Sequence, residues 1–343
     1  MRRRHDAGAS AGGGPRVVLH ADDLGLNAAV NAGILQSARQ GLLTSTSLLA
    51  NGPQAAAALA AWKELLELQR SGELPSSAAR RRLEDPNQPF DLGIHLNLTQ
   101  GRPLTAGRYP AELLDREGRF PGPAALFRRL CGRSTPFAAR IEAELAAQIE
   151  FMLDHGAKPT HLNGHQYMEI MPALAAVIPR LVQKYALPAI RLPLERNAWL
   201  VSFRPGFRCA NAGLALVKRF YAERFRRVVE RAGMAHPDAF FGSSHAGCVS
   251  LSLLERFLAR PQRFSLAEIA LHPGAESPAS PGEPDGWSDP LSAARPHELA
   301  MLLSPALEEL LARRGLKLGR VGAQQAPISA AQERLSSANS FSI

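Results

Sequence analysis

Short apolar runs alternate with longer helical segments along most of this chain. Runs suited to buried strands occupy 17–21, 42–49, 90–98, 159–162, 189–192 and 269–272. Spacing and composition predict helices over 27–40, 53–68, 141–153, 174–185, 214–232 and 298–314. This alternation predicts a parallel sheet with right-handed crossovers, either closed as a barrel or open and doubly wound. The pattern fits both forms of sheet.

The size of the chain sets its domain organisation. With 343 residues and 45% hydrophobic composition, it can bury a sizeable core. We predict one domain over 16–320, a disordered leader over 1–15 and a disordered tail over 321–343, which is rich in Ala, Gln and Ser. The segment 70–89 is polar and interrupted by prolines, so we interpret it as a surface insertion.

Cysteine usage and the chain ends bear on location. Cys131, Cys209 and Cys248 are odd in number and far apart, which argues against a disulfide framework or a thiolate zinc site. The basic N-terminus runs into Ala, Gly and Ser and lacks the apolar centre of a signal peptide. No run approaches the roughly 20 apolar residues of a membrane span. We therefore expect a soluble, cytoplasmic protein without a membrane span.

The net charge of +9 raises the question of a nucleic-acid partner. The basic residues gather in short runs, at 2–4 and 80–82, without interleaved aromatic residues or a known binding module. The composition therefore favours no nucleic-acid partner.

Polar side chains stand where the predicted strands end: Asp22 with Asp23, His95, the pair His161 and His165, and His272. Because parallel strands end at one rim, these groups can converge there. Each also has a structural alternative: the aspartates could cap a helix, and each histidine could be a satisfied core or loop residue. Taken together, carboxylates and imidazoles at one rim favour a mixed nitrogen and oxygen site for a divalent cation.

The spacing of His161 and His165 allows two interpretations. Four residues apart on a helix, both would face one metal ion. Asn163 and Gly164 lie between them, however, and favour a turn.

Five segments occur in a fixed order: HADDLGLN (20–27), GLLTSTSLLANG (41–52), GIHLNLTQGRPL (93–104), KPTHLNGH (158–165) and EIALHPG (268–274). Over 16–320 this set resembles the YdjC-like, or ChbG/HpnK, family of carbohydrate deacetylases. The resemblance implies a distorted (β/α) TIM-like barrel with parallel strands and one divalent metal ion, Mg²⁺ or Zn²⁺. It also implies a hydrolase that removes an N-acetyl or similar acyl group from an amino-sugar, oligosaccharide or glycolipid, and it allows a homodimer.

The same resemblance assigns roles to individual residues. It implies Asp23, His95 and His165 as metal ligands, Asp22 as the catalytic base and His272 as the general acid. The residues it implies at the substrate are Arg191, His161, Tyr167 and Asn97. The chain departs from the family pattern at His20, which replaces a smaller polar residue, and after His165, where Gln-Tyr-Met-Glu stands in place of a histidine-rich run.

Rival functions remain open from the sequence. In a NodB-like polysaccharide deacetylase, His161 and His165 would hold the metal with an aspartate, and His95 would be dispensable. A non-catalytic glycan- or lipid-binding protein on the same scaffold would keep the pocket without turnover. A phosphodiesterase-like metal hydrolase is a third possibility, since fold alone does not fix function. Asp22 and His272 beside Asp23 argue against a purely binding role, which needs no paired base and acid.

Overall fold

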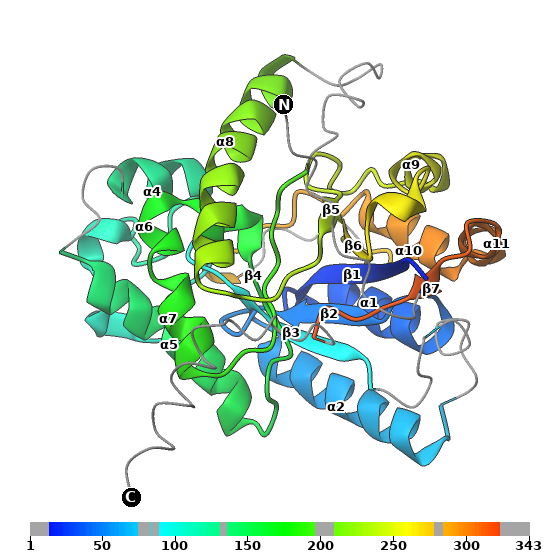
Figure 1. Ribbon diagram of the computed structural model, residues 1–343. Coiled ribbons are helices and arrows are strands. Elements are labelled where there is room, and N and C mark those ends of the chain that lie inside the picture. Colours follow the sequence, from blue (N-terminus) through cyan, green and yellow to red (C-terminus); the bar gives the residue numbers. More distant parts are fainter. Residues whose placement is uncertain are drawn as a thin grey trace, which may run out of the picture.

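The computed structural model describes residues 14–74, 83, 89–130, 136–195, 209–277 and 284–322. At its centre lies a sheet of parallel strands in the order β4-β3-β2-β1-β6-β5, with β7 paired to β1. The strands are β1 (Arg16–Leu24), β2 (Ser45–Leu48), β3 (Asp91–Leu96), β4 (Leu162–Gly164), β5 (Ala239–Phe241), β6 (Leu266–Leu271) and β7 (Lys317–Leu318). The sheet curls and helices pack around it (Figure 1), which confirms the predicted distorted (β/α) barrel.

Backbone hydrogen bonds continue the curled sheet beyond β4, the last strand at that edge. Leu162 N donates to Ala189 O at 3.1 Å, and Ile190 N donates to Ala235 O at 2.9 Å. Ala235 lies just before β5 in the chain, so the segment around Ile190 bridges the two outer edges of the sheet. The strand predicted over 189–192 is therefore reduced to an isolated bridge between Leu162 and Ile190.

The helices follow the predicted order with altered boundaries. They are α1 (Ala28–Gln40), α2 (Ala55–Ser71), α4 (Pro123–Leu130), α5 (Ala138–Asp154), α6 (Pro172–Ala175), α7 (Ile178–Lys184), α8 (Cys209–Arg231), α9 (Leu251–Phe257), α10 (Arg295–Leu303) and α11 (Pro305–Arg313). Two predicted helices are each split, because Pro179 and Pro305 lack an amide hydrogen and lie in the first turn of new helices. Within the described ranges, every helix is too short or too polar to cross a bilayer.

Several elements were not predicted: α4, α9, β5 and β7 are all short. The strand predicted over 159–162 begins only at Leu162 and runs through Gly164, so the turn expected at Asn163 and Gly164 is wrong. Most of the predicted leader, insertion and tail lie outside the described residues, so the domain boundaries stay predictions.

A close backbone contact fixes the rim of the barrel near β6. A methyl group at Gly33, on α1, would come within 2.4 Å of Gly274 Cα. Glycine at position 33 lets α1 touch the loop that follows β6, and a methyl group at Gly274 would instead meet the side chain of Arg295. Since His272 lies on this loop, the contact helps to set the position of the last polar group of the rim.

A buried carboxylate, Asp91, lies at the opposite end of β3. It is fully buried, and its Oδ2 accepts a hydrogen bond from Gly322 N at 3.1 Å. Burial raises the pKa of Asp91 to about 6, although Arg320, 4.0 Å away, pulls it down. The folded protein therefore holds this proton more tightly than the unfolded chain does. Its contribution to stability is complete below about pH 4 and is lost as pH rises to about 6.

Replacing Asp91 with asparagine is expected to stabilise the protein at alkaline pH. The amide keeps an acceptor for Gly322 N and removes the buried charge. A shift of about 2 pKa units corresponds to up to about 3 kcal/mol in the free energy of unfolding at pH 8. Urea denaturation of both proteins at pH 4, 6 and 8 measures the difference, which should shrink to nearly zero at pH 4. A less stable Asp91→Asn variant at pH 8 would contradict this account.

Candidate active site

A bulge at the end of β1 turns both neighbouring aspartates toward the site. Ala21 pairs with Thr46 and Leu24 with Leu48, so β1 has one residue more than β2 between these pairs. Asp23 occupies the left-handed region with φ 72°, a conformation that aspartate tolerates better than most residues. Regular alternation would send Asp22 and Asp23 to opposite faces, whereas a bulge re-aims a side chain. Both carboxylates consequently line one cavity.

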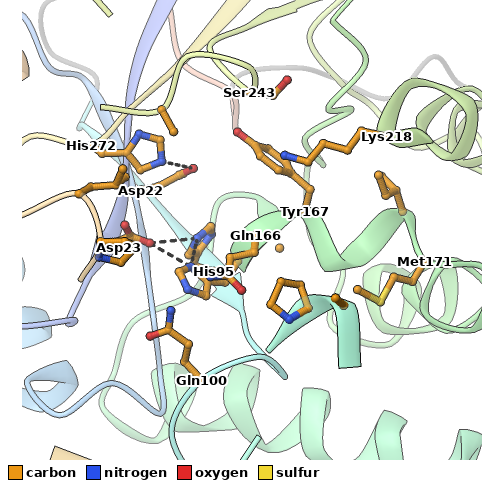
Figure 2. Close-up of a pocket in the computed structure, with 18 of the residues that line it drawn as sticks. Asp22, Asp23, His95, Gln100, Gln166, Tyr167, Met171, Lys218, Ser243 and His272 are labelled. Carbon is orange, nitrogen blue, oxygen red and sulfur yellow. Dashed lines mark hydrogen bonds and ion pairs between the residues drawn. The ribbon is translucent and has the colours of Figure 1, made fainter. Parts of the chain in front are cut away.

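Asp23, His95 and His165 bring their donor atoms together from three strand ends. Asp23 Oδ1 lies 3.0 Å from His165 Nδ1 and 3.5 Å from His95 Nε2, and the two nitrogens are 3.3 Å apart. Figure 2 shows Asp23 and His95 facing each other at the cavity wall. Atoms bound at about 2.1 Å to one tetrahedral ion are separated by about 3.4 Å. This buried group has the residues and spacing to hold a metal ion.

The surroundings of Asp23 also keep its carboxylate ionised. Its second oxygen, Oδ2, accepts a hydrogen bond from Arg295 Nη2 at 2.8 Å. Burial alone would raise the pKa of Asp23, but Arg295, His165 and His95 together hold it well below its usual value. A carboxylate ligand must be deprotonated to bind a cation. The surroundings of Asp23 therefore suit that role.

Asp22 lies beside the three donors in a second set of hydrogen bonds. Arg191 Nη1 donates to Asp22 Oδ2 at 2.7 Å, and Asn163 Nδ2 donates to Oδ1 at 3.0 Å. Burial would raise the pKa of Asp22, yet Arg191, His95 and His20 hold it well below its usual range. His272 Nε2 lies 3.9 Å from Asp22 Oδ2 and lines the same cavity. Asp22 and His272 are thus adjacent polar groups at the site (Figure 2).

The buried charges around these aspartates do not balance. Arg191 bridges Asp22 and Glu268, and Arg295 bridges Asp23 and Asp289. When all four carboxylates are ionised, the two guanidinium groups leave an excess of two negative charges. Uncompensated buried charge is costly. One divalent cation would neutralise this cluster, and the donor set therefore fits a divalent metal ion in charge as well as in spacing.

The cavity beside these residues measures about 650 Å³. His272 and Gln100 line it near the aspartates, and Ser243 and Tyr167 line it farther along (Figure 2). Arg295, which contacts Asp23, lines it as well. Gln166 and Tyr167 both have positive φ, at 53° and 58°, which is an uncommon backbone conformation for side chains of this size. Strain of this kind gathers at functional sites. Here the two residues with positive φ immediately follow His165, and this backbone conformation brings Tyr167 to the cavity.

Three residues expected at the substrate lie elsewhere. Arg191 and His161 are fully buried, and neither is among the residues that line the cavity. Arg191 holds Asp22 in place, and His161 Nδ1 lies 3.0 Å from Thr160 Oγ1 while its ring packs on Gly93. Both side chains are enclosed by protein in this structure, and their predicted contacts with the substrate stay predictions. His161 is also absent from the group whose donor atoms converge.

Asn97 is the third of these residues. It is fully buried, and its Oδ1 accepts hydrogen bonds from Thr99 N at 2.9 Å and Gln100 N at 3.2 Å. Its Nδ2 donates to Gln100 O at 2.8 Å. Asn97 shapes the loop that brings Gln100 to the cavity, and its contact with the substrate stays a prediction. Tyr167, in contrast, lines the cavity.

Other residues of the site were missed from the sequence. Arg295 begins an ordinary helix 272 positions after Asp23, and nothing in its local pattern indicates a contact with Asp23. Glu268 carried a signal, because it is the one charge in the apolar strand LAEIAL. A charged residue in a fully buried strand needs a partner, and Arg191 provides it.

Comparison with known proteins gives a consistent result. The family model described as "YdjC-like protein" matches residues 16–313. A human protein named carbohydrate deacetylase is 32% identical over 324 residues, which cover 88% of this chain and 89% of that protein. A Geobacillus stearothermophilus protein of the same name is 28% identical and covers 88% of this chain and 94% of its own length.

A solved structure supports the fold. A crystal structure from Enterococcus faecalis, described as that of a cellobiose-phosphate cleavage protein, superposes with a TM-score of 0.61. It is 21% identical and covers 90% of this chain and 98% of its own. At this identity the likeness concerns the fold alone.

Proposed function

The chain belongs to the YdjC-like family, and from this premise we propose that it is a metal-dependent hydrolase that removes an N-acetyl group from an amino-sugar. The observation that carries the proposal is the convergence of Asp23, His95 and His165 beside Asp22 and His272. The names of the relatives support a carbohydrate substrate.

The donor set bears on the identity of the metal. Two imidazole nitrogens and one carboxylate oxygen suit Zn²⁺, whereas Mg²⁺ prefers oxygen ligands and retains several waters. We therefore favour Zn²⁺ for Asp23, His95 and His165. Such an ion supplies Lewis-acid polarisation of the amide carbonyl and makes a nearby water more acidic.

The remaining groups of the site would move protons. Asp22 is ionised because of Arg191, so it can accept a proton from the attacking water. The ion pair makes it a weak base, which favours onward transfer of that proton. His272 Nε2 lies 3.9 Å from Asp22 Oδ2 and would donate a proton to the departing amine. Asn163 and Arg191 hold the orientation of Asp22 during both steps.

The structure gives less support to the three alternative functions: a NodB-like deacetylase, a non-catalytic binding protein and a phosphodiesterase-like hydrolase. In the NodB-like arrangement His161 would be a ligand, yet it lies enclosed beneath the site and His95 occupies the third position. A binding protein without turnover would have no need of a carboxylate and an imidazole side by side. No observation in the described part of the chain favours the phosphodiesterase.

Acetate release from N-acetylglucosamine glycosides tests the proposed function. The protein should release acetate after loading with Zn²⁺, lose more than about 90% of its rate with a chelator, and recover on return of metal, since metal polarisation is worth several kcal/mol. Loading with Mg²⁺ in parallel tests the preference for nitrogen ligands. The proposal fails if the rate is unchanged by chelation under conditions that remove all bound metal.

A further inference from the structure

A short segment that precedes α10 lies against the site, far beyond the metal-binding candidates in the sequence. We call residues 284–291 the rim segment. Its residues Ser288, Pro290 and Leu291 line the cavity. Trp287 is buried, and the centroid of its ring lies 6.5 Å from that of His165. The rim segment is therefore a neighbour of the converging donor atoms.

Contacts with the loop that follows β3 fix the rim segment in place. Ser288 N donates a hydrogen bond to Gln100 Oε1 at 3.1 Å. The Trp287 ring packs against Gly101, where a methyl group would come within 2.3 Å of the ring nitrogen. His95 lies on the strand that leads into this loop. The position of the rim segment is consequently tied to the strand that carries one of the three donors.

Asp289, in the same segment, binds the guanidinium of Arg295. Its Oδ1 and Oδ2 both accept from Arg295 Nε, at 2.9 and 2.8 Å. The pair is shielded from solvent, since the side chains of Asp289 and Arg295 are 7% and 3% exposed. Leu291 N donates to Asp289 Oδ1 at 3.2 Å, which holds the carboxylate in a turn. The methylene stem of Arg295 packs on Gly274, so the arginine is held at its stem and at Nε.

These restraints determine where the rest of the guanidinium points. The group is planar and rigid, so a fixed stem and a fixed Nε also fix the direction of Nη2. Nη2 of Arg295 donates to Asp23 Oδ2 at 2.8 Å. The other oxygen of Asp23, Oδ1, lies 3.0 Å from His165 Nδ1 and 3.5 Å from His95 Nε2. A continuous set of contacts thus runs from Asp289 through Arg295 to the oxygen that meets the two histidines.

Neutralising Arg295 does not by itself explain Asp289. Asp23 already supplies one negative charge to this guanidinium. A second buried carboxylate on the same arginine adds charge that the protein leaves uncompensated, and such charge is costly. Its presence is accounted for when a cation binds at Asp23 and when the orientation of Arg295 matters for that binding.

We propose that Asp289 is a positioning residue of the metal site, which acts through Arg295 to hold Asp23 in the orientation that binds the ion. This rests on the proposed function, because that function places a divalent metal ion at Asp23. Changes to the outer hydrogen bonds of a metal site typically lower metal affinity by about 10- to 100-fold. Asp289 is one contact further from the ion than Arg295, so we expect an effect of about tenfold, at the lower end of this range.

Two replacements of Asp289 separate position from charge. Asp289→Ala should weaken Zn²⁺ binding about tenfold, as measured by titration against a competing chelator. Asp289→Asn also removes the charge but keeps Oδ1, which accepts from both Arg295 Nε and Leu291 N. Its Zn²⁺ affinity should therefore stay within about threefold of the parent value. An equal loss in both variants would show that charge, and not the hold on Arg295, sets the affinity, and would overturn the proposal.

Asp238→Ala is the matched control. Asp238 also accepts backbone hydrogen bonds, from Ser265 N at 2.8 Å and Leu266 N at 3.1 Å, but it does so at the start of β6, at the opposite end of the strand from His272. Its loss should reduce stability without changing Zn²⁺ affinity. Circular dichroism and urea denaturation check the fold of every variant. If Asp289→Ala does not fold, Asp289→Ser takes its place, because a hydroxyl group can still close the turn but is too short to hold Arg295.

A double-mutant cycle tests the route through Arg295. Arg295→Met should weaken Zn²⁺ binding by about 10- to 100-fold. Adding Asp289→Ala to Arg295→Met should cause no further loss, because residues that act through one another are not additive. The double variant removes both members of the ion pair, so neither is left as an unpaired buried charge. Additive losses would mean that Asp289 acts on the ion independently, and would overturn the positioning role.

The outcomes distinguish this inference from the proposed function, because the affinity measurements need no substrate. Parent-like Zn²⁺ affinity in a folded Asp289→Ala variant overturns the positioning role and leaves the deacetylase intact. The predicted losses of affinity in a protein that releases no acetate support the positioning role and overturn the proposed function alone. A parent protein that binds no Zn²⁺ overturns both.

Discussion

Replacing Asp22 with asparagine is expected to lower kcat for acetate release by at least about a hundredfold, because general-base assistance typically contributes 10²- to 10⁴-fold. Asparagine keeps the shape of the side chain and one acceptor for Arg191, but its amide cannot take up a proton from water. Asp22 does not belong to the converging donor group, so bound metal should stay near the level of the parent protein. Steady-state rates and elemental analysis of the same samples measure both quantities.

Glu268→Gln is the matched control for this change. Glu268 binds the same guanidinium, with Oε1 2.7 Å from Arg191 Nη2, but it does not line the cavity. Its replacement disturbs the buried ion pair without removing a proton acceptor from the site. We expect a loss of less than about tenfold, well below the contribution of a general base. Near-full turnover by Asp22→Asn, or an equal loss in both variants, would show that Asp22 is not the base.

The second large effect concerns metal content. His95→Ala removes one of three protein donors, and metal affinity should fall by more than about a hundredfold, since changes to outer hydrogen bonds alone cost 10- to 100-fold. Activity at limiting Zn²⁺ should be lost in parallel. Titration with Zn²⁺ against a competing chelator measures the affinity, and circular dichroism checks the fold.

His161→Ala provides the comparison, because His161 is equally buried and lies in the same part of the sheet. Its loss leaves a hole behind β3 and should reduce stability, but the converging atoms of Asp23, His95 and His165 stay in place. We expect Zn²⁺ affinity within about tenfold of the parent value, less than the loss of a ligand. The reverse pattern, with metal lost from His161→Ala and kept by His95→Ala, would restore the NodB-like arrangement.

The architecture could be predicted from the sequence because each buried strand and each covering helix has a recognisable apolar pattern. Apolar runs such as 17–21 and 269–272 must be covered on both faces, and the helical segments between them supply the cover. The order of elements left a barrel and an open sheet as alternatives. The five ordered segments, through their family resemblance, favoured the barrel, and the hydrogen bonds around Ile190 agree with it.

The site was predicted less completely. Polar residues at strand ends pointed to Asp22, Asp23 and His95, because parallel strands end at one rim. The same reasoning could not separate side chains that reach the cavity from those beneath it. Arg191 and His161 stand at strand ends too, yet they face buried neighbours. That distinction depends on the curl of the sheet and on the bulge at Asp22 and Asp23, which no residue pattern encodes.

The contact between Asp23 and Arg295 has a consequence for biosynthesis. All three metal-binding candidates have been synthesised once the chain reaches His165, but the guanidinium that contacts Asp23 is made much later. A nascent chain can therefore contain all three ligand residues while still lacking the arginine that orients Asp23. We expect an N-terminal fragment that ends before α10 to bind Zn²⁺ weakly, so that metal is acquired only after synthesis of the chain is nearly complete.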